Sequence, residues 1–352
     1  MKQEGQLVAK LLRALPLTVP SPFHFSSLSL PRSKTKSGAA RGTLTTIRLG
    51  PGDDAAVLSP SGKSDLVLSC DAFIEGVHFQ IKTHPADSVG YKSLARATSD
   101  LAAMGATPRF FLLTLALPKS LAGSWLDGFL KGMARASRQL GISVIGGDTT
   151  VSPMVSVSIT VLGKIAPRAA VGRSGARPGD LIYVSGKLGR AQLGLDLVLA
   201  GHALDRTFRS EVNAHLYPKI QIELGEWLAR TGVATAMMDI SDGLSTDLNR
   251  LCAASRVGAQ VHADKIPRVA ISAQAANQLR KRKLNPLQMA LHGGEDYELL
   301  FTVSPNRAPQ LRKAPNFSAL TTIGEITRKR EVALIDCDGK SSLLKPAGWD
   351  PF

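Results

Sequence analysis

Residues 87–118, "DSVGYKSLARATSDLAAMGATPRFFLLTLALP", predict a helix that is followed directly by a buried strand. Small and apolar residues recur at helical intervals up to Gly105 and Pro108, two residue types that end helices. The run "FFLLTLAL" at 110–117 has the length of a strand and is the most apolar run of the chain. A helix that leads into a buried strand is typical of a sheet covered by helices.

The same alternation continues on both sides of this stretch. In the first half we expect a short helix at 5–15, a strand that begins near 64, a helix at 123–141 that Gly141 ends, and strands at 142–150 and 154–165. In the second half we expect a strand at 181–186, a helix at 190–201, a long helix within 218–231, a strand that turns into a helix at "DISDG" within 233–255, and a strand after "GGED" at 293–296. The pattern predicts an α+β (mixed α/β) protein of two domains, 1–167 and 168–352, each a sheet flanked by helices.

The composition fits a globular protein with enough apolar residues for two cores. The chain has 352 residues, of which 44% are hydrophobic. Its three cysteines, Cys70, Cys252 and Cys337, are isolated, so we expect neither a zinc site nor a disulfide framework, and we expect a reducing cytoplasmic location. No stretch approaches the roughly 20 apolar residues that span a bilayer, so we expect no membrane insertion.

The positive charge is concentrated near the N-terminus. The formal net charge is +15, and residues 1–52 hold eight lysines and arginines but only one acid. Residues 16–45 are rich in Pro, Ser and basic residues, which predicts a poorly ordered insertion; an organelle transit peptide has the same composition and stays an alternative. A nucleic-acid-binding protein is a further alternative, but aromatic residues make up only 5% of the chain and do not alternate with the basic ones, so we expect small anions as ligands.

Acidic residues recur where apolar strands meet loops or helices. The set consists of Asp53, Asp54, Asp71, Asp100, Asp148, Asp239 and Asp242. Adjacent carboxylates, as in "LGPGDDAAVL" at 49–58, repel each other and need a cation, amide donors or exposure to water. Several carboxylates that converge at strand ends suit Mg²⁺, which bridges substrate phosphates. An exposed turn for the pair and a helix cap for Asp242 stay alternatives.

Pairs of glycines accompany several of these acids. "GPG" at 50–52 and the two glycine pairs at 146–147 and 293–294 permit the close backbone approach that a phosphate-binding loop needs. Each of them alone also indicates an ordinary turn. No GxxxxGK[ST] motif occurs, so a P-loop ATPase or kinase is excluded.

Six motifs in this order resemble those of the bacterial thiamine-monophosphate kinase family. They are "GPGDDAAVL", "DAFIEGVHF", "VGYKSLARATSDLAAMGATPR", "VIGGDTT", "MDISDGLSTDL" and "GGEDYELLF". The resemblance runs from about residue 46 to the end, and "EGQLVAKLLRAL" is similar to the first helix of the family. It implies the two-domain aminoimidazole-ribonucleotide-synthetase-like fold and a homodimer formed through the N-terminal domains. It also implies direct in-line phosphorylation of thiamine monophosphate by ATP with Mg²⁺, the last step of thiamine diphosphate biosynthesis.

The resemblance also assigns roles to residues. For the metal it implies Asp53, Asp54, Asp71, Asp100, Asp148, Asp239 and Asp242 with the Ser69–Cys70 backbone, and for catalysis Asp54, Asp239 and Asp242. For ATP it implies Gly147, Asp148, Arg173, Ser241 and Leu130, and for thiamine monophosphate His78, Glu295 and Trp349. From the residues alone, Arg173 could be an exposed linker charge, His78 a core histidine, Glu295 a helix-start carboxylate and Trp349 a lid on the core.

The chain departs from the family pattern at three positions. Cys70 stands where the family usually has Thr, Leu130 where an aromatic residue often packs on adenine, and Ala97 where Asn is frequent. Other members of the superfamily are the nearest alternatives. A selenophosphate synthetase needs a reactive Cys or Sec with Lys in an N-terminal loop, and a hydrogenase-maturation protein needs a C-terminal Cys, but this chain ends in "WDPF".

Overall fold

The computed structural model describes residues 46–49, 53–60 and 63–350. The expected helix at 5–15, the expected insertion at 16–45 and the "GPG" turn at 50–52 lie outside the described residues. Within the described part, no helix is both long enough and apolar enough to cross a membrane.

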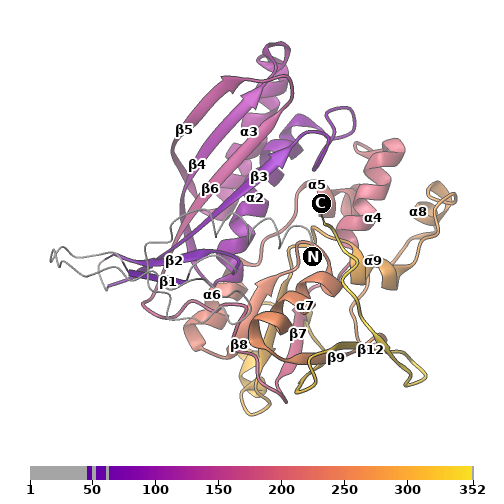
Figure 1. Cartoon of the computed structure of the whole chain (residues 1–352). Helices are drawn as coiled ribbons and strands as arrows, with labels where there is room; N and C mark the ends of the chain where they lie inside the picture. Colours follow the sequence, from indigo (N-terminus) through magenta and orange to yellow (C-terminus); the bar gives the residue numbers. More distant parts are fainter. Residues whose placement is uncertain (1–45, 50–52, 61–62, 351–352) are drawn as a thin grey trace, which may run out of the picture.

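The first sheet has six strands in the order β1-β2-β3-β6-β4-β5 (Figure 1). The strands are β1 (Thr46–Leu49), β2 (Ala56–Ser59), β3 (Asp65–Ile74), β4 (Thr107–Leu117), β5 (Ser143–Val151) and β6 (Ser156–Ile165). All neighbouring pairs are antiparallel except β4 and β5, which are parallel. The sheet is therefore mixed, as the alternation of helices and strands predicts.

Two helices cover one face of this sheet. Helix α2 (Ala86–Ala103) packs on β3 and β6, and α3 (Ser124–Leu140) packs on α2. Helix α3 ends at Gly141, whose φ of 64° gives the left-handed cap that its sequence position predicts. In Figure 1 both helices lie together behind the sheet. Alternate residues of β6 are buried on the covered face, as its predicted period of two requires.

The second sheet has seven strands in the order β13-β12-β9-β11-β7-β10-β8. The strands are β7 (Leu181–Ser185), β8 (Ala234–Asp239), β9 (Gly258–His262), β10 (Leu299–Val303), β11 (Leu320–Thr327), β12 (Val332–Ile335) and β13 (Ser341–Leu343). The helices are α4 (Arg190–Leu197), α5 (Arg209–Leu216), α6 (Ile222–Thr231), α7 (Leu244–Ser255), α8 (Ala273–Gln278) and α9 (Pro286–His292). Short helical turns occupy Lys119–Leu121, Val198–His202, Arg206–Phe208, Ala308–Lys313 and Phe317–Ala319.

Two expectations for the second half need adjustment. The long helix expected within 218–231 begins only at Ile222, because Pro218 and the three residues after it form no regular secondary structure. Helix α5, just before this segment, was not expected from the periodicity. The chain passes from the first sheet to the second between Ile165 and Leu181, and the exact boundary at 167/168 stays a prediction.

The two halves share a core. Leu224 and Leu228 of α6 and Phe301 of β10 belong to the same buried cluster as Leu94 and Leu101 of α2. Gly225 permits this close packing, because a Cβ atom there would lie 2.1 Å from the carbonyl oxygen of Ala102. Helix α2 is therefore held between the first sheet and the second half of the chain, and its side chains can meet residues from both.

Candidate active site

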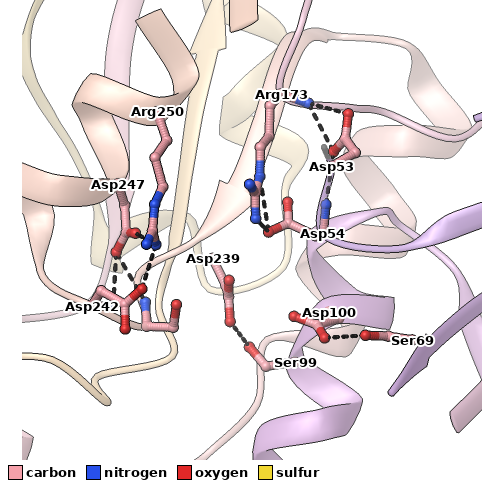
Figure 2. Close-up of polar contacts among 11 residues, drawn as sticks. Asp53, Asp54, Ser69, Ser99, Asp100, Arg173, Asp239, Asp242, Asp247 and Arg250 are labelled. Atoms are coloured by element: carbon pink, nitrogen blue, oxygen red, sulfur yellow. Dashed lines mark hydrogen bonds and ion pairs between the residues drawn. The ribbon is translucent and has the colours of Figure 1, made fainter. Parts of the chain in front are cut away.

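Three aspartates that are far apart in the sequence meet between the two halves. Asp54 lies just before β2, Asp100 lies in α2, and Asp239 ends β8. One carboxylate oxygen from each lies within 4.8 Å of the other two. Asp54 and Asp239 are buried, and Asp100 is partly buried. Figure 2 shows the three side chains directed toward one another.

The groups around this acidic cluster hold it in place. Ser99 Oγ donates a hydrogen bond to Asp239 Oδ2 at 2.5 Å, and Ser69 Oγ donates one to Asp100 Oδ2 at 2.5 Å. Arg173 Nη2 lies 2.5 Å from Asp54 Oδ1, which makes a buried ion pair (Figure 2). The other oxygen, Asp54 Oδ2, is buried and has no hydrogen-bond partner among the described residues. Such an oxygen is free to bind a cation.

The negative charges in this cluster are only partly compensated. Burial, reinforced by the charge of Asp54, raises the pKa of Asp239 to about 7. Burial and the charges of Asp71, Asp239 and Asp54 raise the pKa of Asp100 well above its ordinary value. A divalent cation would offset the repulsion, and carboxylate oxygens are the ligands that Mg²⁺ and Ca²⁺ prefer. The residues therefore fit a divalent metal ion.

Asp53 holds the Arg173 loop instead of joining the acidic cluster. Its carboxylate accepts hydrogen bonds from the backbone N–H groups of Arg173 at 3.1 Å and of Asp54 at 3.0 Å. Burial, with the neighbouring charge of Asp54, raises the pKa of Asp53 to about 7. The exposed-turn alternative for the Asp53–Asp54 pair is thus wrong, and so is the exposed-linker alternative for Arg173.

A second group of acids lies at the start of α7. Asp247 Oδ2 accepts hydrogen bonds from the backbone N–H groups of Ser241 and Asp242, at 3.1 and 3.0 Å. Arg250 forms ion pairs with both Asp242 and Asp247 (Figure 2). The helix cap is Gly243, so the cap alternative for Asp242 is wrong. Arg250 holds the carboxylate of Asp242 close enough to Asp239 for the two charges to interact.

The structure leaves several predicted residues apart from the acidic cluster. Asp71 pairs with Arg96 at 3.1 Å. The Cys70 side chain is exposed on the opposite face of β3, where its sulfur contacts Ser158 and Thr160 at 3.6 and 3.3 Å. Asp71 and Cys70 are therefore outside the three-carboxylate group, and their metal roles stay predictions, the Cys70 role resting on its backbone.

The predicted ATP residues on the first sheet and α3 are solvent-exposed. Asp148 lies on β5, a strand exposed along its whole length, and accepts a hydrogen bond from Thr149 N at 2.8 Å. Gly147, with φ of 148°, lies so close to β4 that a Cβ atom would be 1.8 Å from the carbonyl oxygen of Leu113. Leu130 on α3 is 46% exposed. These three roles also stay predictions.

A buried cluster of two basic side chains and one carboxylate lies along the same helix, and burial with the charge of Lys92 lowers the pKa of its histidine, His215, well below the ordinary value. Lys92 of α2 is fully buried, and its Nζ atom lies 2.7 Å from Glu295 Oε2. His215 of α5 contacts both, with Nδ1 3.3 Å from Glu295 and 3.2 Å from Lys92 Nζ. Burial would raise the pKa of Glu295, but Lys92 and His215 outweigh it and lower the pKa to about 2. Glu295 is thus an ionised carboxylate, and its backbone has a φ of 67°, which is unusual for a residue with a side chain.

The other two predicted substrate residues lie near these groups. His78 Nδ1 accepts a hydrogen bond from Ile74 N at 3.0 Å, and its ring lies beside Phe73. Burial and the positive charge of Arg96 lower the pKa of His78, so the imidazole is neutral at pH 7. Trp349 is 48% exposed, and its backbone N–H donates to the carbonyl oxygen of Asp242 at 3.1 Å.

Comparisons with known proteins identify the family of this chain. The family described as AIR synthase related protein, N-terminal domain, matches residues 52–165, and AIR synthase related protein, C-terminal domain, matches residues 177–337. The thiamine-monophosphate kinase of Synechococcus elongatus is 37% identical over 307 residues, which cover 86% of this chain and 91% of that protein. The chain belongs to the thiamine-monophosphate kinase family.

A second relative and a solved structure extend the match. The thiamine-monophosphate kinase of Aquifex aeolicus is 35% identical over 302 residues, which cover 86% of this chain and 92% of that protein. The structure described as "AaThiL complexed with AMPPCP and TMP" has a TM-score of 0.74 and 34% identity, and the match covers 86% of this chain and 91% of that one. The family and the two-domain fold predicted from the six motifs are confirmed.

Sequence reasoning missed four polar residues of this thiamine-monophosphate kinase family site. They are Lys92, Arg96, His215 and Asp247. Lys92 and Arg96 had a readable signal, because they are charged residues spaced four apart in a helix whose other residues are mostly small or apolar. His215 had none, since its helix was not expected, and Asp247 resembled any acid in a first helical turn.

Proposed function

We propose that this chain is an ATP-dependent kinase that converts thiamine monophosphate to thiamine diphosphate. The observation that carries the proposal is the meeting of Asp54, Asp100 and Asp239 in a chain that is 34% identical to a protein whose structure contains AMPPCP and TMP. AMPPCP is an ATP analogue. A cluster of converging carboxylates supplies the metal ligands that a metal-dependent phosphoryl transfer needs.

The reaction needs positioning and charge neutralisation more than it needs a strong base. An oxygen of the acceptor phosphate is already ionised near neutral pH and attacks the γ-phosphorus of ATP in line with the leaving group. A new P–O bond forms to the acceptor, the bond from the γ-phosphorus to the β,γ-bridging oxygen breaks, and ADP leaves with that electron pair. Both reactants are anions, so the site must hold them together against their repulsion.

We infer that Mg²⁺ is the resident metal. Asp54, Asp100 and Asp239 would hold it, and the unpartnered Asp54 Oδ2 atom supports this. When bound, Mg²⁺ supplies positive charge beside the phosphate oxygens. The predicted contributions of Asp53, Asp71, Asp148, Asp242 and the Ser69–Cys70 backbone would place further ions nearby. Arg173, paired with Asp54, would meet the phosphates of ATP from the second half of the chain.

The remaining predicted residues divide between the two substrates. Gly147, Asp148, Ser241 and Leu130 would contact ATP, and their positions on β5, at the start of α7 and on α3 define the surfaces involved. His78, Glu295 and Trp349 would contact thiamine monophosphate. Glu295 and His78 are partly buried beside α2, whereas Trp349 has an exposed ring that can stack on the substrate.

We also propose a homodimer formed through the N-terminal sheet. Its support is the apolar surface of β4 and β5, where Phe110 is 46%, Leu112 38%, Val144 58% and Ile145 55% exposed. Apolar side chains gathered in this way mark an interaction surface. Analytical ultracentrifugation should give a dimer for the wild type and a monomer for Phe110→Lys; a wild type that sediments as a monomer contradicts the proposal.

A cytoplasmic location is part of the proposal. Cys70, Cys252 and Cys337 are unpaired, which suits a reducing compartment. Among alternative enzymes of the same superfamily, none has the support that curated relatives at 37% and 35% identity give to thiamine-monophosphate kinase.

One assay separates the kinase from the nucleic-acid-binding alternative. Purified protein is mixed with ATP, Mg²⁺ and thiamine monophosphate, and thiamine diphosphate is measured by chromatography. Thiamine diphosphate that forms only with Mg²⁺ supports the proposal. No product, together with nucleic-acid binding that weakens steeply with added salt, would favour the alternative instead.

A further inference from the structure

Arg96 lies on α2 between the two clusters of the site. It is four residues from Lys92 and four from Asp100, so along the helix axis it is about 6 Å from each. Asp100 belongs to the three-carboxylate cluster, and Lys92 is paired with Glu295. Arg96 therefore lies between Asp100, at the end of the site that fits a metal ion, and Lys92, whose partner Glu295 is predicted to contact the acceptor substrate.

The guanidinium group of Arg96 is only partly used by the protein. Its Nε atom donates to Asp71 Oδ2 at 3.1 Å, and the group lies over the ring of Phe73, 5.4 Å from the centroid. Its Nη1 atom is buried and has no hydrogen-bond partner among the described residues. A buried N–H group of a charged side chain without an acceptor is costly, so such groups in folded proteins normally have a partner.

The surroundings of Arg96 indicate what this partner is. His78, whose pKa burial and the charge of Arg96 lower, lies on one side, and Phe73 packs beneath the guanidinium. Asp71 receives only the Nε hydrogen bond, which leaves Nη1 without an acceptor among the described residues. A planar guanidinium whose Nη1 atom has no acceptor can donate to an oxygen of a phosphate.

We propose that Arg96 binds the phosphate of the acceptor, with Nη1 donating to a phosphate oxygen while Nε stays on Asp71. This inference rests on the proposed function and adds a substrate-contacting residue to it. The phosphate would then lie one helical turn from Asp100, where the γ-phosphate of ATP meets the acidic cluster. A positive charge on the non-attacking oxygens reduces the repulsion between the two phosphates and leaves the attacking oxygen free.

The test compares binding of thiamine monophosphate with binding of thiamine, which lacks the phosphate. Calorimetry on the full chain with AMPPCP and Mg²⁺ gives both affinities for the wild type, Arg96→Met and Arg96→Lys. The wild type should prefer thiamine monophosphate, and Arg96→Met should lose about 10- to 100-fold of that preference, the range for a hydrogen bond between charged groups. In turnover, the KM for thiamine monophosphate should rise while the KM for ATP stays unchanged. Arg96→Lys should recover part of the preference.

Arg135→Met is the matched control. Arg135 also has a buried Nη atom without a hydrogen-bond partner among the described residues, and it stacks on Tyr91 and Tyr217, at 4.9 and 4.2 Å from the ring centroids. Its variant should keep the wild-type preference.

Three results would overturn the inference. An unchanged preference for thiamine monophosphate in Arg96→Met overturns it, and if that variant does not fold, an unchanged preference in the neutral, polar Arg96→Gln does so. A raised Mg²⁺ requirement with an unchanged preference would mean that Arg96 only supports Asp71. A wild type that forms no thiamine diphosphate overturns the proposed function itself, which the wild-type assay detects without any variant.

Discussion

The two ends of the site on helix α2 differ in how far their charges are compensated within the protein. At Asp100 the helix meets two more carboxylates, and oxygen atoms from all three lie within 4.8 Å. Two turns earlier, Lys92 is fully buried against Glu295 and His215. The carboxylates of the acidic end have only Arg173 as a paired cation, whereas at the basic end Lys92 and Glu295 compensate each other. The contrast indicates that the acidic end binds a cation, whereas the basic end stabilises the folded protein.

Both ends require the two halves of the chain to pack together. Asp239 and Arg173 bring the second half to the acidic end, and Glu295 and His215 bring it to the basic end. The shared core between α2 and α6 sets this packing. Function and domain packing are therefore coupled at α2, and substitutions at its two ends should have different consequences.

The largest effect is expected at the acidic end. Asp54→Asn and Asp239→Asn should each lower turnover roughly a thousandfold or more, because the charge that holds the metal is removed. Metal-free Asp239→Asn should be as stable as the wild type or slightly more stable, since repulsion among buried carboxylates is relieved, whereas Asp54→Asn also loses its ion pair with Arg173 and should gain less or become less stable. Turnover and thermal melting check both statements, and the exposed Asp264→Asn is the control. Unchanged turnover in both variants would contradict the metal role.

The opposite pattern is expected at the basic end. Lys92→Met leaves Glu295 without its closest cation and should lower the free energy of unfolding by about 3 to 5 kcal/mol, as loss of one partner of a buried pair does. Lys329→Met, which breaks the exposed Lys329–Glu331 pair, is the control and should cost less than about 1 kcal/mol. Denaturant unfolding measures both values. Equal costs for the two variants would show that the basic end is not a buried ion-pair cluster.

Glu298, which belongs to neither end of the site, shows how burial raises the pKa of a carboxylate. Burial and the charge of Asp296 raise its pKa from the ordinary 4.5 to about 7, although Ser185 and Gln221 donate hydrogen bonds to it. The unfolded chain releases this proton first, so the native state binds more protons between pH 4.5 and 7. The stabilisation is therefore complete below pH 4.5 and is lost as the pH rises toward 7.

Substitution of Glu298 should remove this pH dependence. Between pH 5 and 8 the wild type should lose up to about 3 kcal/mol of unfolding free energy relative to Glu298→Gln, measured by urea unfolding at both pH values. A wild type and variant with parallel profiles would show that Glu298 titrates normally.

The smallest effect is expected at Leu130, the predicted adenine contact. This side chain is 46% exposed, so Leu130→Ala removes only a partial apolar contact. The KM for ATP should rise about threefold, and the KM for thiamine monophosphate should not change. Leu204→Ala, at a residue that is 84% exposed, is the control. A change in the KM for thiamine monophosphate alone would contradict the predicted contact between Leu130 and the adenine of ATP.

The convergence of Asp54, Asp100 and Asp239 could be predicted from the sequence because each position depends on local rules, and the metal role of these residues stays a prediction. Asp239 is the last residue of a buried strand, Asp54 precedes a half-buried one, and Asp100 follows from the helical spacing of α2, so each position could be deduced from periodicity and motif. The side chain of Cys70 points to the other face of β3 for the same reason, since side chains alternate along a strand.

The basic end could not be predicted in the same way. The contact between Lys92 and His215 exists only because α5 packs beside α2, and no local pattern specifies the packing of two helices that are 123 residues apart at this contact. Likewise, Asp247 in α7 accepts hydrogen bonds from the backbone N–H groups of Ser241 and Asp242. The conformation of the loop before α7 therefore determines which acid forms these bonds.

Binding of Mn²⁺, a paramagnetic substitute for Mg²⁺, tests the central claim most directly. Electron paramagnetic resonance titrations with AMPPCP present would count the bound ions in the wild type and in Asp54→Asn, Asp100→Asn and Asp239→Asn. We predict that each variant loses at least one bound ion or binds it at least about tenfold more weakly. The same number of ions bound with the same affinity in all three variants would contradict the claim that these aspartates form a metal site.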